Sequence, residues 1–234
     1  MRNFLKESLC AIGVEADDNC LDNFIKYNDL LIEWNEKINL TAITEPSEVV
    51  IKHFTDSVTG EKLLGKGAKV IDVGAGAGFP SLPLKLVRDD LEVLMLDSLG
   101  KRVNFLNEVI GALSLEKISA INARAEEVSK KDLRESFDAC VSRAVARLSV
   151  LCEYCLPFVK VGGVFLAYKG PQGLDELNDA KKAISVLGGE VSEIKEYNLP
   201  NSDITHTIIV IKKVRQTPLK YPRNSGKISK SPIV

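Results

Sequence analysis

The sequence predicts an α/β fold: a mostly parallel, doubly wound sheet of seven strands with an antiparallel last strand, preceded by helices. Three observations predict it. From Lys69 onward, short apolar runs alternate with helical patterns, as in a parallel sheet covered on both faces. A turn with three glycines follows the first apolar run. The last two runs have no helix between them, so they are expected to form an antiparallel pair.

Residues 1–65 contain helical patterns alone and are predicted to form an N-terminal cap. Apolar residues at three- and four-residue spacing predict helices over 3–12, over 17–36 and from Pro46 onward. Asp17 or Asp18 is a suitable N-cap for the second helix. Because its apolar stripe needs a partner, the cap is expected to pack on the following domain. His53 and Asp56 share the last helix, and structural hydrogen bonding or a place in a substrate cleft stays open for both.

A glycine-rich turn organises the second predicted domain, residues 66–214. The first strand runs directly into Gly74, Gly76 and Gly78. Glycine adopts positive φ readily and has no Cβ, so the backbone there can bend sharply and approach a ligand. A dinucleotide-binding turn would have its third glycine where Phe79 stands, and a phosphate-binding loop would continue Gly-Lys-Ser/Thr. The remaining common interpretation is the Asp/Glu-x-Gly-x-Gly-x-Gly turn that binds S-adenosylmethionine, with a purely structural tight turn as the alternative.

The second strand supports this interpretation because it ends in Asp97, 23 residues after Gly74. A carboxylate at that distance accepts hydrogen bonds from ribose hydroxyls in Rossmann-like folds, whereas a solvated strand-end carboxylate is the alternative. Apolar runs predict strands over 69–73, 91–97, 117–122, 137–142, 163–169, 190–198 and 205–214, with helices over 80–88, 100–112, 124–130, 146–158 and 172–187. In such a sheet the ligand lies across the carboxyl ends of the strands, beside the first one.

The loops after the later strands supply further candidates at the same edge. Glu126 follows the third strand, where it can meet an adenine amino group or simply favour a helix start. The segment 142–146 follows the fourth strand and faces the transferable methyl. It lacks the Asn/Asp-Pro-Pro-Tyr/Phe motif of enzymes that methylate exocyclic base amines. Lys169 ends the fifth strand, where it can hold a phosphate or extend its ammonium into solvent.

The composition is that of an ordinary globular protein, with 234 residues, 45% hydrophobic and 27% charged. No apolar run has the length of a membrane span and the start does not resemble a signal peptide, so a soluble, cytoplasmic protein is expected. The five cysteines are an odd number in core-like surroundings, as expected of reduced thiols. Cys152 and Cys155 have no second pair nearby, so we expect two buried residues on one helix face and no metal.

The end of the chain carries a concentration of positive charge. Residues 212–234 contain seven basic residues and no acid, which leaves 24 bases against 32 acids in residues 1–211. A basic segment on an acidic body favours a polyanionic partner, and a solvated tail is the alternative. We therefore treat residues 215–234 as a basic C-terminal tail.

The combined segments resemble a known family over nearly the whole chain. The resemblance is carried by Trp34-Asn35, Asn39-Leu40-Thr41, His53-Phe54 with Asp56-Ser57, Asp72 to Pro80, Leu96 to Arg102, Arg124 to Glu127, Ser142 to Ala144, Lys169-Gly170 and Tyr221 to Arg223. These segments are similar to the RsmG (GidB) family, bacterial methyltransferases that modify N7 of a guanosine in small-subunit (16S) ribosomal RNA. Thr55, Ser81 and the stretch Arg223–Lys227 depart from the family pattern.

This resemblance implies a class I methyltransferase that uses S-adenosylmethionine. Its partner would be 16S ribosomal RNA, within the small subunit or an assembly intermediate, and the protein would be a monomer. With the glycine turn, the resemblance implies a set of cofactor contacts: Gly74, Gly76, Gly78, Phe79, Asp97, Ala125, Glu126 and Arg143. Arg143 is the candidate positioning residue. The residues expected to contact RNA are Lys169, Arg223 and Lys227.

The implied chemistry suits a chain with two histidines. Guanine N7 presents an unprotonated lone pair at neutral pH, so positioning and exclusion of water are expected in place of a general base. Two alternatives stay open. One is a methyltransferase of a small molecule or a protein, and the other is a non-catalytic ribosome-assembly factor with the same fold.

Overall fold

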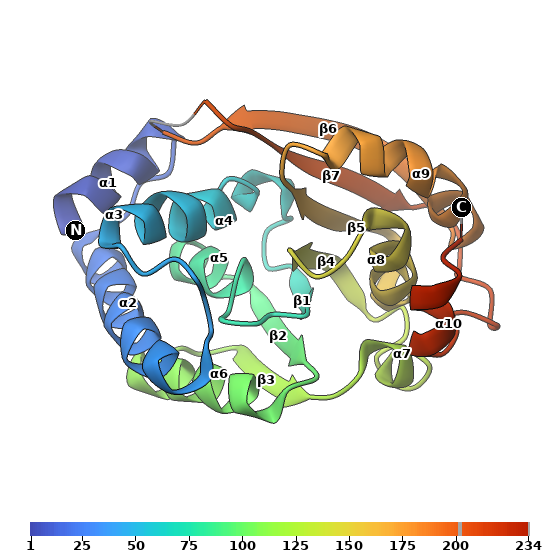
Figure 1. Cartoon of the computed structure of the whole chain (residues 1–234), viewed down its shortest axis with the longest axis horizontal. Helices are drawn as coiled ribbons and strands as arrows, with labels where there is room; N and C mark the ends of the chain where they lie inside the picture. The colour runs from blue at the N-terminus through green and yellow to red at the C-terminus, as the bar shows by residue number, and fades with distance from the viewer. Residues whose placement is uncertain (201–202, 234) are drawn as a thin grey trace.

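The computed structural model describes residues 1–200 and 203–233 and contains a seven-stranded sheet in the order β3-β2-β1-β4-β5-β7-β6 (Figure 1). The strands are β1 (Lys69–Val73), β2 (Glu92–Asp97), β3 (Ile118–Asn122), β4 (Phe137–Arg143), β5 (Val159–Lys169), β6 (Gly189–Asn198) and β7 (Thr205–Lys213). Strands β1 to β5 are parallel, and β7 is antiparallel to both neighbours. The predicted fold class is confirmed. The strand order reverses between β1 and β4, which is where α/β sheets bind ligands.

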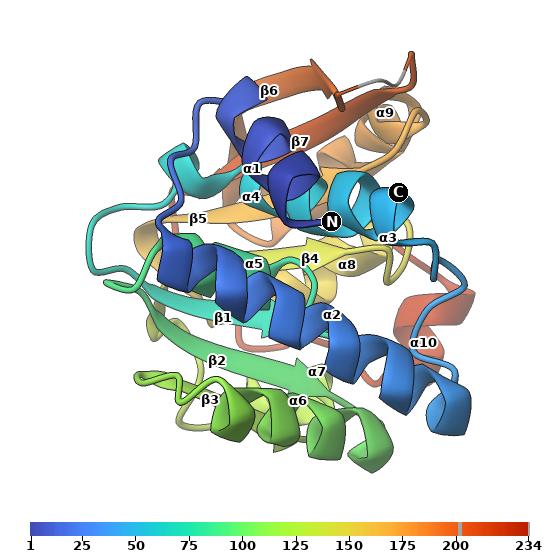
Figure 2. The same cartoon turned by 90° about the vertical axis from the view of Figure 1, so that its left-hand side faces the viewer.

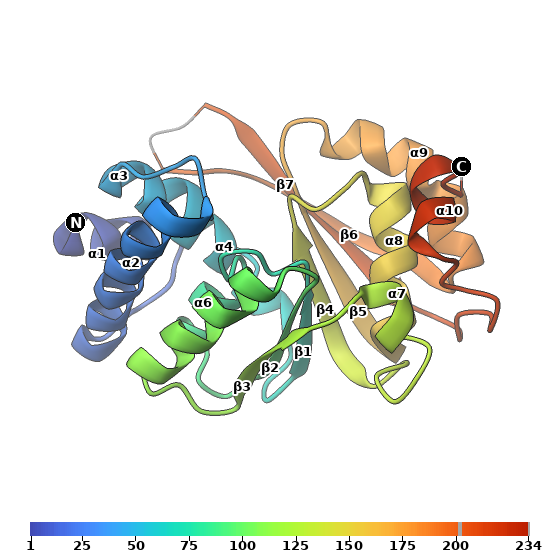
Figure 3. The same ribbon diagram turned by 60° about the horizontal axis from the view of Figure 1, so that its bottom comes forward.

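Helices cover both faces of the sheet (Figure 3). They are α1 (Arg2–Ala11), α2 (Asp18–Ile38), α3 (Pro46–Val49), α4 (Asp56–Val58), α5 (Ser81–Val87), α6 (Gly100–Ala112), α7 (Ala125–Val128), α8 (Leu148–Cys155), α9 (Gly173–Val186) and α10 (Ser225–Lys230). Alternate strand residues enter two cores. Val70 packs with α2, α5 and α6, whereas Ile71 packs with α8 and α9. The strands are therefore apolar at consecutive positions. None of the described helices combines the length and the apolar character needed to cross a membrane.

The N-terminal helices pack directly on the sheet domain. Asp17 caps α2, since its Oδ1 accepts a hydrogen bond from the amide of Cys20 at 2.7 Å. Figure 2 shows α2 running across the face that α5 and α6 cover. The side chains of Phe24 and Leu31 are fully buried there, in the same core as Val70. Residues 1–65 thus share one hydrophobic core with the sheet.

The helix that begins at Pro46 contains an irregularity. A π-helical segment, Val50–Thr55, separates α3 from α4. A π turn inserts one residue into the helix and changes where the following side chains point, and such turns are frequent at functional sites. This segment carries His53 and leads directly into Asp56. The sequence predicts the helix, but its apolar spacing does not reveal the π segment.

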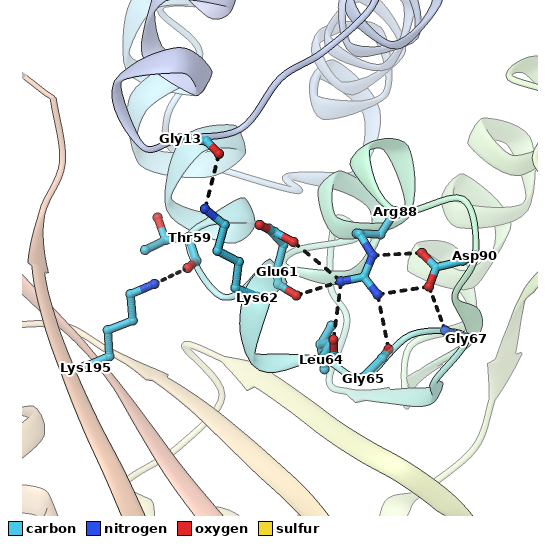
Figure 4. A network of polar contacts seen from close by, with 10 residues as sticks. All are labelled: Gly13, Thr59, Glu61, Lys62, Leu64, Gly65, Gly67, Arg88, Asp90 and Lys195. Carbon is cyan, nitrogen blue, oxygen red and sulfur yellow. Dashed lines mark hydrogen bonds and ion pairs between the residues drawn. The ribbon is translucent and has the colours of Figure 1, made fainter.

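The connection between the cap and β1 is fixed by polar contacts, shown in Figure 4. Arg88 donates hydrogen bonds to the carbonyls of Glu61 (2.9 Å), Leu64 and Gly65, and its guanidinium pairs with Asp90. The Asp90 carboxylate in turn accepts from the amide of Gly67 at 2.6 Å. Because one arginine satisfies several loop carbonyls, the connection has a defined conformation rather than that of a free linker.

The C-terminal segment is folded, whereas the sequence suggested a basic tail. Helix α10 packs beside α7 and α8 (Figure 3), and Ile228 is 0% exposed. Arg223 forms an ion pair with Glu153, whose side chain is 1% exposed. Arg134 donates to the carbonyls of Thr217 and Tyr221. Residues 215–233 therefore form an integral part of the domain.

Candidate active site

A cavity of about 670 Å³ lies over the carboxyl ends of β1 and β2, at the predicted position. Four loops and the cap supply most of its lining. The complete set of lining residues is Leu40, Thr41, His53, Val73 to Ala77, Phe79, Leu96 to Ser98, Arg102, Ala123 to Glu126, Arg143 to Ala146, Val150, Tyr154, Ser225 and Ser229. All the predicted cofactor contacts except Gly78 line it. The structure therefore brings together residues that are far apart in the sequence.

The glycine turn forms the floor of this cavity. Gly74, Gly76 and Gly78 have φ values of +77°, +58° and +95°. A Cβ on Gly78 would lie 2.3 Å from Cδ1 of Leu82 and 2.8 Å from the hydroxyl of Tyr27, so glycine is required there by packing as well as by φ. The Tyr27 hydroxyl donates to the carbonyl of Ala77. Gly78 therefore allows the turn to pack closely on Leu82 and Tyr27, on the side away from the cavity.

The space around Gly76 is different. A Cβ added there would meet nothing closer than the carbonyl oxygen of Gly74, at 3.9 Å. The turn therefore leaves a backbone cradle open toward the cavity. The acid of the motif, Asp72, lies below the turn, where its Oδ2 accepts a hydrogen bond from the amide of Ser81 at 3.2 Å. Burial raises the pKa of Asp72 to about 7.

Asp97 is placed as predicted, at the tip of β2 against the turn. Its Oδ2 accepts a hydrogen bond from the amide of Gly76 at 2.9 Å, and its Oδ1 accepts from the amide of Leu99 at 2.9 Å. Arg102 Nη1 lies 3.5 Å from Oδ2. A carboxylate oxygen accepts more than one hydrogen bond, so Asp97 can hold the turn and still accept from ribose hydroxyls. A carboxylate acceptor in this position fits the ribose hydroxyls of S-adenosylmethionine.

The end of the cavity beside α7 is closed by residues that sequence reasoning missed. Ala125 and Glu126 begin α7 and line this end, as predicted. Tyr154 of α8 and Ser225 and Ser229 of α10 line it as well. Their positions depend on how α8 and α10 pack, and no local motif marks them. The C-terminal segment thus contributes to the cavity over the glycine turn.

The opposite end of the cavity is built around the ring of Phe79. The ring of His53 stacks on it at a centroid distance of 4.4 Å, and the guanidinium carbon of Arg143 lies 5.0 Å from its centroid. Thr41 Oγ1 lies 2.8 Å from His53 Nε2. Burial, together with the charge of Arg143, lowers the pKa of His53 to about 3. The imidazole is therefore neutral at physiological pH, and His53 lines the cleft.

Asp56 connects three elements behind this end of the cavity. Its carboxylate forms an ion pair with Arg143 at 2.5 Å, accepts a hydrogen bond from the Tyr197 hydroxyl at 2.7 Å and lies 3.1 Å from Nδ1 of His206. Burial alone raises the pKa of Asp56, but hydrogen bonding with His206 and the charge of Arg143 bring it below its ordinary value. Asp56 is therefore ionised, and it fixes Arg143 relative to β6 and β7.

A second cavity, of about 1170 Å³, adjoins the first. It is lined by residues of the cap, of the carboxyl ends of β4 and β5 with the loops that follow them, and of β6, β7 and the segments next to them. The two cavities share His53 and residues 143–146 as a common wall. Within residues 1–200 and 203–233, no cluster of His, Cys, Asp or Glu side chains could hold a metal ion.

The three residues predicted to contact RNA differ in their surroundings. Lys169 is buried, and its ammonium donates to Glu176 (2.8 Å) and to the carbonyl of Ala146 (2.7 Å). Arg223 donates to both carboxylate oxygens of Glu153. Lys227 is exposed on α10. The charges of Lys169 and Arg223 are neutralised by Glu176 and Glu153, which does not favour these two residues as phosphate ligands. The sequence alone does not reveal the carboxylate beside each.

Solved structures share this architecture. The chain superimposes on a SAM-dependent O-methyltransferase from Thermotoga maritima with a TM-score of 0.52 and 18% identity, covering 80% of this chain and 73% of that one. It also superimposes on TYW2 from M. jannaschii, solved in complex with AdoMet, with a TM-score of 0.51 and 16% identity, covering 68% and 77% of the two chains. The fold is that of the class I S-adenosylmethionine-dependent methyltransferases.

Sequence comparison gives the family within this class. Residues 20–205 match the family described as GidB, rRNA small subunit methyltransferase G. Ribosomal RNA small subunit methyltransferase G of Alkaliphilus oremlandii (strain OhILAs) is 53% identical over 236 residues, which cover 100% of this chain and 99% of the relative. The protein of that name from Acetivibrio thermocellus is 53% identical over 235 residues, covering 100% and 97%. The chain belongs to the rRNA small subunit methyltransferase G family.

Proposed function

We propose that the protein transfers a methyl group from S-adenosylmethionine to N7 of a guanosine in 16S ribosomal RNA. The observation that carries this proposal is the site itself. A cofactor cavity meets a second cavity at a wall made of a neutral histidine and a fixed arginine, in a chain of the rRNA small subunit methyltransferase G family. S-adenosylmethionine supplies an electrophilic methyl group on a sulfonium.

The residues at the wall suit an acceptor atom that needs no deprotonation. Guanine N7 already carries a lone pair, so the protein has to orient the base and exclude water. His53 is held by Thr41 through one ring nitrogen, and its other ring nitrogen faces Arg143 at 3.4 Å. A general base would need a pKa near neutral pH, and the pKa of His53 is lowered far below that range. In this proposal His53 and Arg143 position the reactants.

The roles of the cofactor residues follow from their positions. In the proposal, the turn cradles the cofactor, Asp97 binds its ribose hydroxyls, and Ala125 and Glu126 bound its adenine ring. Phe79 and Arg143 lie at the methyl end. Tyr154, Ser225 and Ser229 complete the adenine end.

The proposed partner is 16S ribosomal RNA, presented within the small subunit or an assembly intermediate in the cytoplasm, with the protein acting as a monomer. Folded RNA is commonly recognised by shape, which supports a structured substrate. Two other functions use the same cavity: methylation of a small molecule or protein, and a non-catalytic role in ribosome assembly. A single-turnover assay with labelled S-adenosylmethionine separates them. Label is expected in small-subunit RNA. Label in metabolites or protein, or no transfer, would contradict the proposal.

We predict that Lys227→Ala flattens the salt dependence of RNA binding. Removal of one phosphate contact should reduce the slope of log affinity against log salt by about 0.7–0.9, because fewer counterions are released on binding. Binding titrations at several salt concentrations measure this slope, and affinity for S-adenosylhomocysteine, measured by calorimetry, should stay unchanged. An unaltered slope would place the phosphate contact elsewhere. Deleting residues 215–234 is no equivalent test, since it also removes Ser225 and Ser229 from the cofactor cavity.

A further inference from the structure

The second cavity has the position that a methyl acceptor requires. It reaches the cofactor cavity at the wall formed by His53 and residues 143–146, beside the end of the cavity where Phe79 and Arg143 lie. Ala144 within this wall has φ +56°, a conformation that costs energy for a residue with a Cβ. The side chain of Val145 packs directly on the glycine turn: a Cβ on Gly74 would lie 2.5 Å from Cγ2 of Val145. A molecule in the second cavity therefore lies against the same residues that line the cofactor cavity at this end.

The lining of the second cavity suits a purine base. Its walls combine apolar and aromatic side chains, which can pack against a planar ring, with charged side chains of both signs, which can meet the polar edge of a base and its phosphate. The apolar and aromatic members include Phe4, Ile43, Ile51, Tyr168, Tyr197 and Leu199. A volume of about 1170 Å³ has room for a nucleotide as well as its base. A base in this position must have left its stack, as in other enzymes that modify bases.

Arg143 presents hydrogen-bond donors at the wall. Its Nη1 donates to Asp56 and to the carbonyl of Lys52, and its Nη2 lies 3.4 Å from His53 Nδ1. Among the described residues, the hydrogen bonds of this guanidinium run from Nη1 and Nη2, which leaves its Nε–H without a protein acceptor. On the major-groove edge of guanine the oxygen O6 lies beside N7, whereas adenine has an amino donor at that place. A guanidinium N–H beside the wall thus matches guanine and opposes adenine.

The second cavity also has an exposed lysine in its lining, which could contact the phosphate of a bound nucleotide. Lys52 lines it, is exposed, and pairs with Glu48 across one helical turn. Such an exposed pair contributes little to stability, so the lysine is free to exchange its partner for a phosphate. Lys37 and Glu33 form the same kind of exposed pair on α2 and line neither cavity. The chain therefore contains its own matched control.

We propose that the second cavity binds the target guanosine, flipped out of its RNA strand, with Arg143 donating to guanine O6 and Lys52 facing the backbone phosphate. The proposal rests on the proposed function and adds the location and the base specificity of the acceptor site. It leaves N7 free of hydrogen bonds, as its role as the attacking atom requires. It also gives Asp56 a definite part, because the ion pair with Asp56 fixes the guanidinium that reads the base.

The first test compares Lys52→Glu with Lys37→Glu, using small subunits that lack the methyl group. Lys52→Glu is expected to raise KM for the subunit about tenfold, because a repelled phosphate weakens RNA binding. Its affinity for S-adenosylhomocysteine should equal that of the wild type. Lys37→Glu should change neither quantity. Equal KM values for the two variants would overturn the proposal, while methyl transfer by the wild type would leave the proposed function standing.

The second test addresses the base itself. Guanosine, inosine and adenosine 5′-monophosphates are added as competitors of methyl transfer by the wild-type protein. Guanosine and inosine share O6 and N7, so both should inhibit competitively against the subunit, and adenosine monophosphate should be about tenfold weaker. Because Arg143→Met is expected to transfer little methyl, direct binding of the three nucleotides is compared by calorimetry in the wild type and in this variant, and the variant should show no preference. Equal inhibition by all three nucleotides, no inhibition by any, or a preference that survives in Arg143→Met would contradict the assignment. Absence of transfer by the wild type would instead count against the proposed function.

Discussion

Asp56→Ala is expected to destabilise the protein by about 3 kcal/mol and to reduce methyl transfer strongly. The substitution leaves the guanidinium of Arg143 in a largely buried position without its counter-charge, and breaking a buried ion pair on one side typically costs about 3–5 kcal/mol. The hydrogen bonds to Tyr197 and His206 are lost as well. Urea unfolding measures the change in stability. Because the pKa of Asp56 is lowered, its contribution exists above the pKa of the unfolded state and is lost as the pH falls through the lower folded-state pKa.

The double variant Asp56→Ala, Arg143→Met separates stability from positioning. Removing both charges eliminates the unpaired cation, so part of the lost stability should return. Methyl transfer should stay low, because the residue proposed to orient the reactants is still missing, and misplacement by 1 Å can cost about 100-fold in rate. A double variant that regains activity together with stability would contradict the role given to Arg143. A loss below about 1 kcal/mol in Asp56→Ala would contradict the burial argument.

Gly78→Ala is expected to lower the free energy of unfolding by about 3 kcal/mol. The residue would combine an unfavourable φ of +95° with a Cβ placed 2.3 Å from Leu82 and 2.8 Å from the Tyr27 hydroxyl. Relief of these contacts requires the turn, or the buried side chains of Leu82 and Tyr27 beneath it, to move, so affinity for S-adenosylhomocysteine should fall too. Urea unfolding and calorimetry measure the two effects.

Gly76→Ala is the matched comparison on the same turn. Its Cβ would meet only the Gly74 carbonyl at 3.9 Å, so the loss of stability should stay near 1 kcal/mol. Because Gly76 lines the cavity, the added methyl group should still weaken cofactor binding. If both variants lost the same stability, the packing argument for Gly78 would be wrong.

Much of the fold follows from local sequence patterns. Consecutive apolar residues in β1 and β2 predict buried parallel strands, and the missing helix between β6 and β7 predicts the antiparallel end of the sheet. Gly74 and Asp97 are also predictable. The turn and the tip of the next strand have a fixed relation in this fold, so the spacing in the sequence is enough to place them together.

Other features depend on contacts that no local pattern records. Lys169 and Arg223 appear as free cations in the sequence, but Glu176 and Glu153 neutralise them after folding. Tyr154 reaches the cavity only through the packing of α8 against α7 and α10. The hydrogen bonds of Asp56 to the last two strands join residues about 140 or more positions apart. The sequence therefore predicted the position of the glycine turn and of Asp97 beside the first cavity, and the structure was needed to define the wall between the two cavities.

Nucleoside analysis of 16S ribosomal RNA from cells that lack this gene tests the central claim most directly. Digested RNA is separated by liquid chromatography, and modified nucleosides are identified by mass spectrometry. The account predicts that one N7-methylguanosine disappears, that every other modification stays, and that incubating the isolated small subunits with purified protein and S-adenosylmethionine restores it. An unchanged N7-methylguanosine content, or the loss of a methyl group from a different atom or a different RNA, would contradict the account.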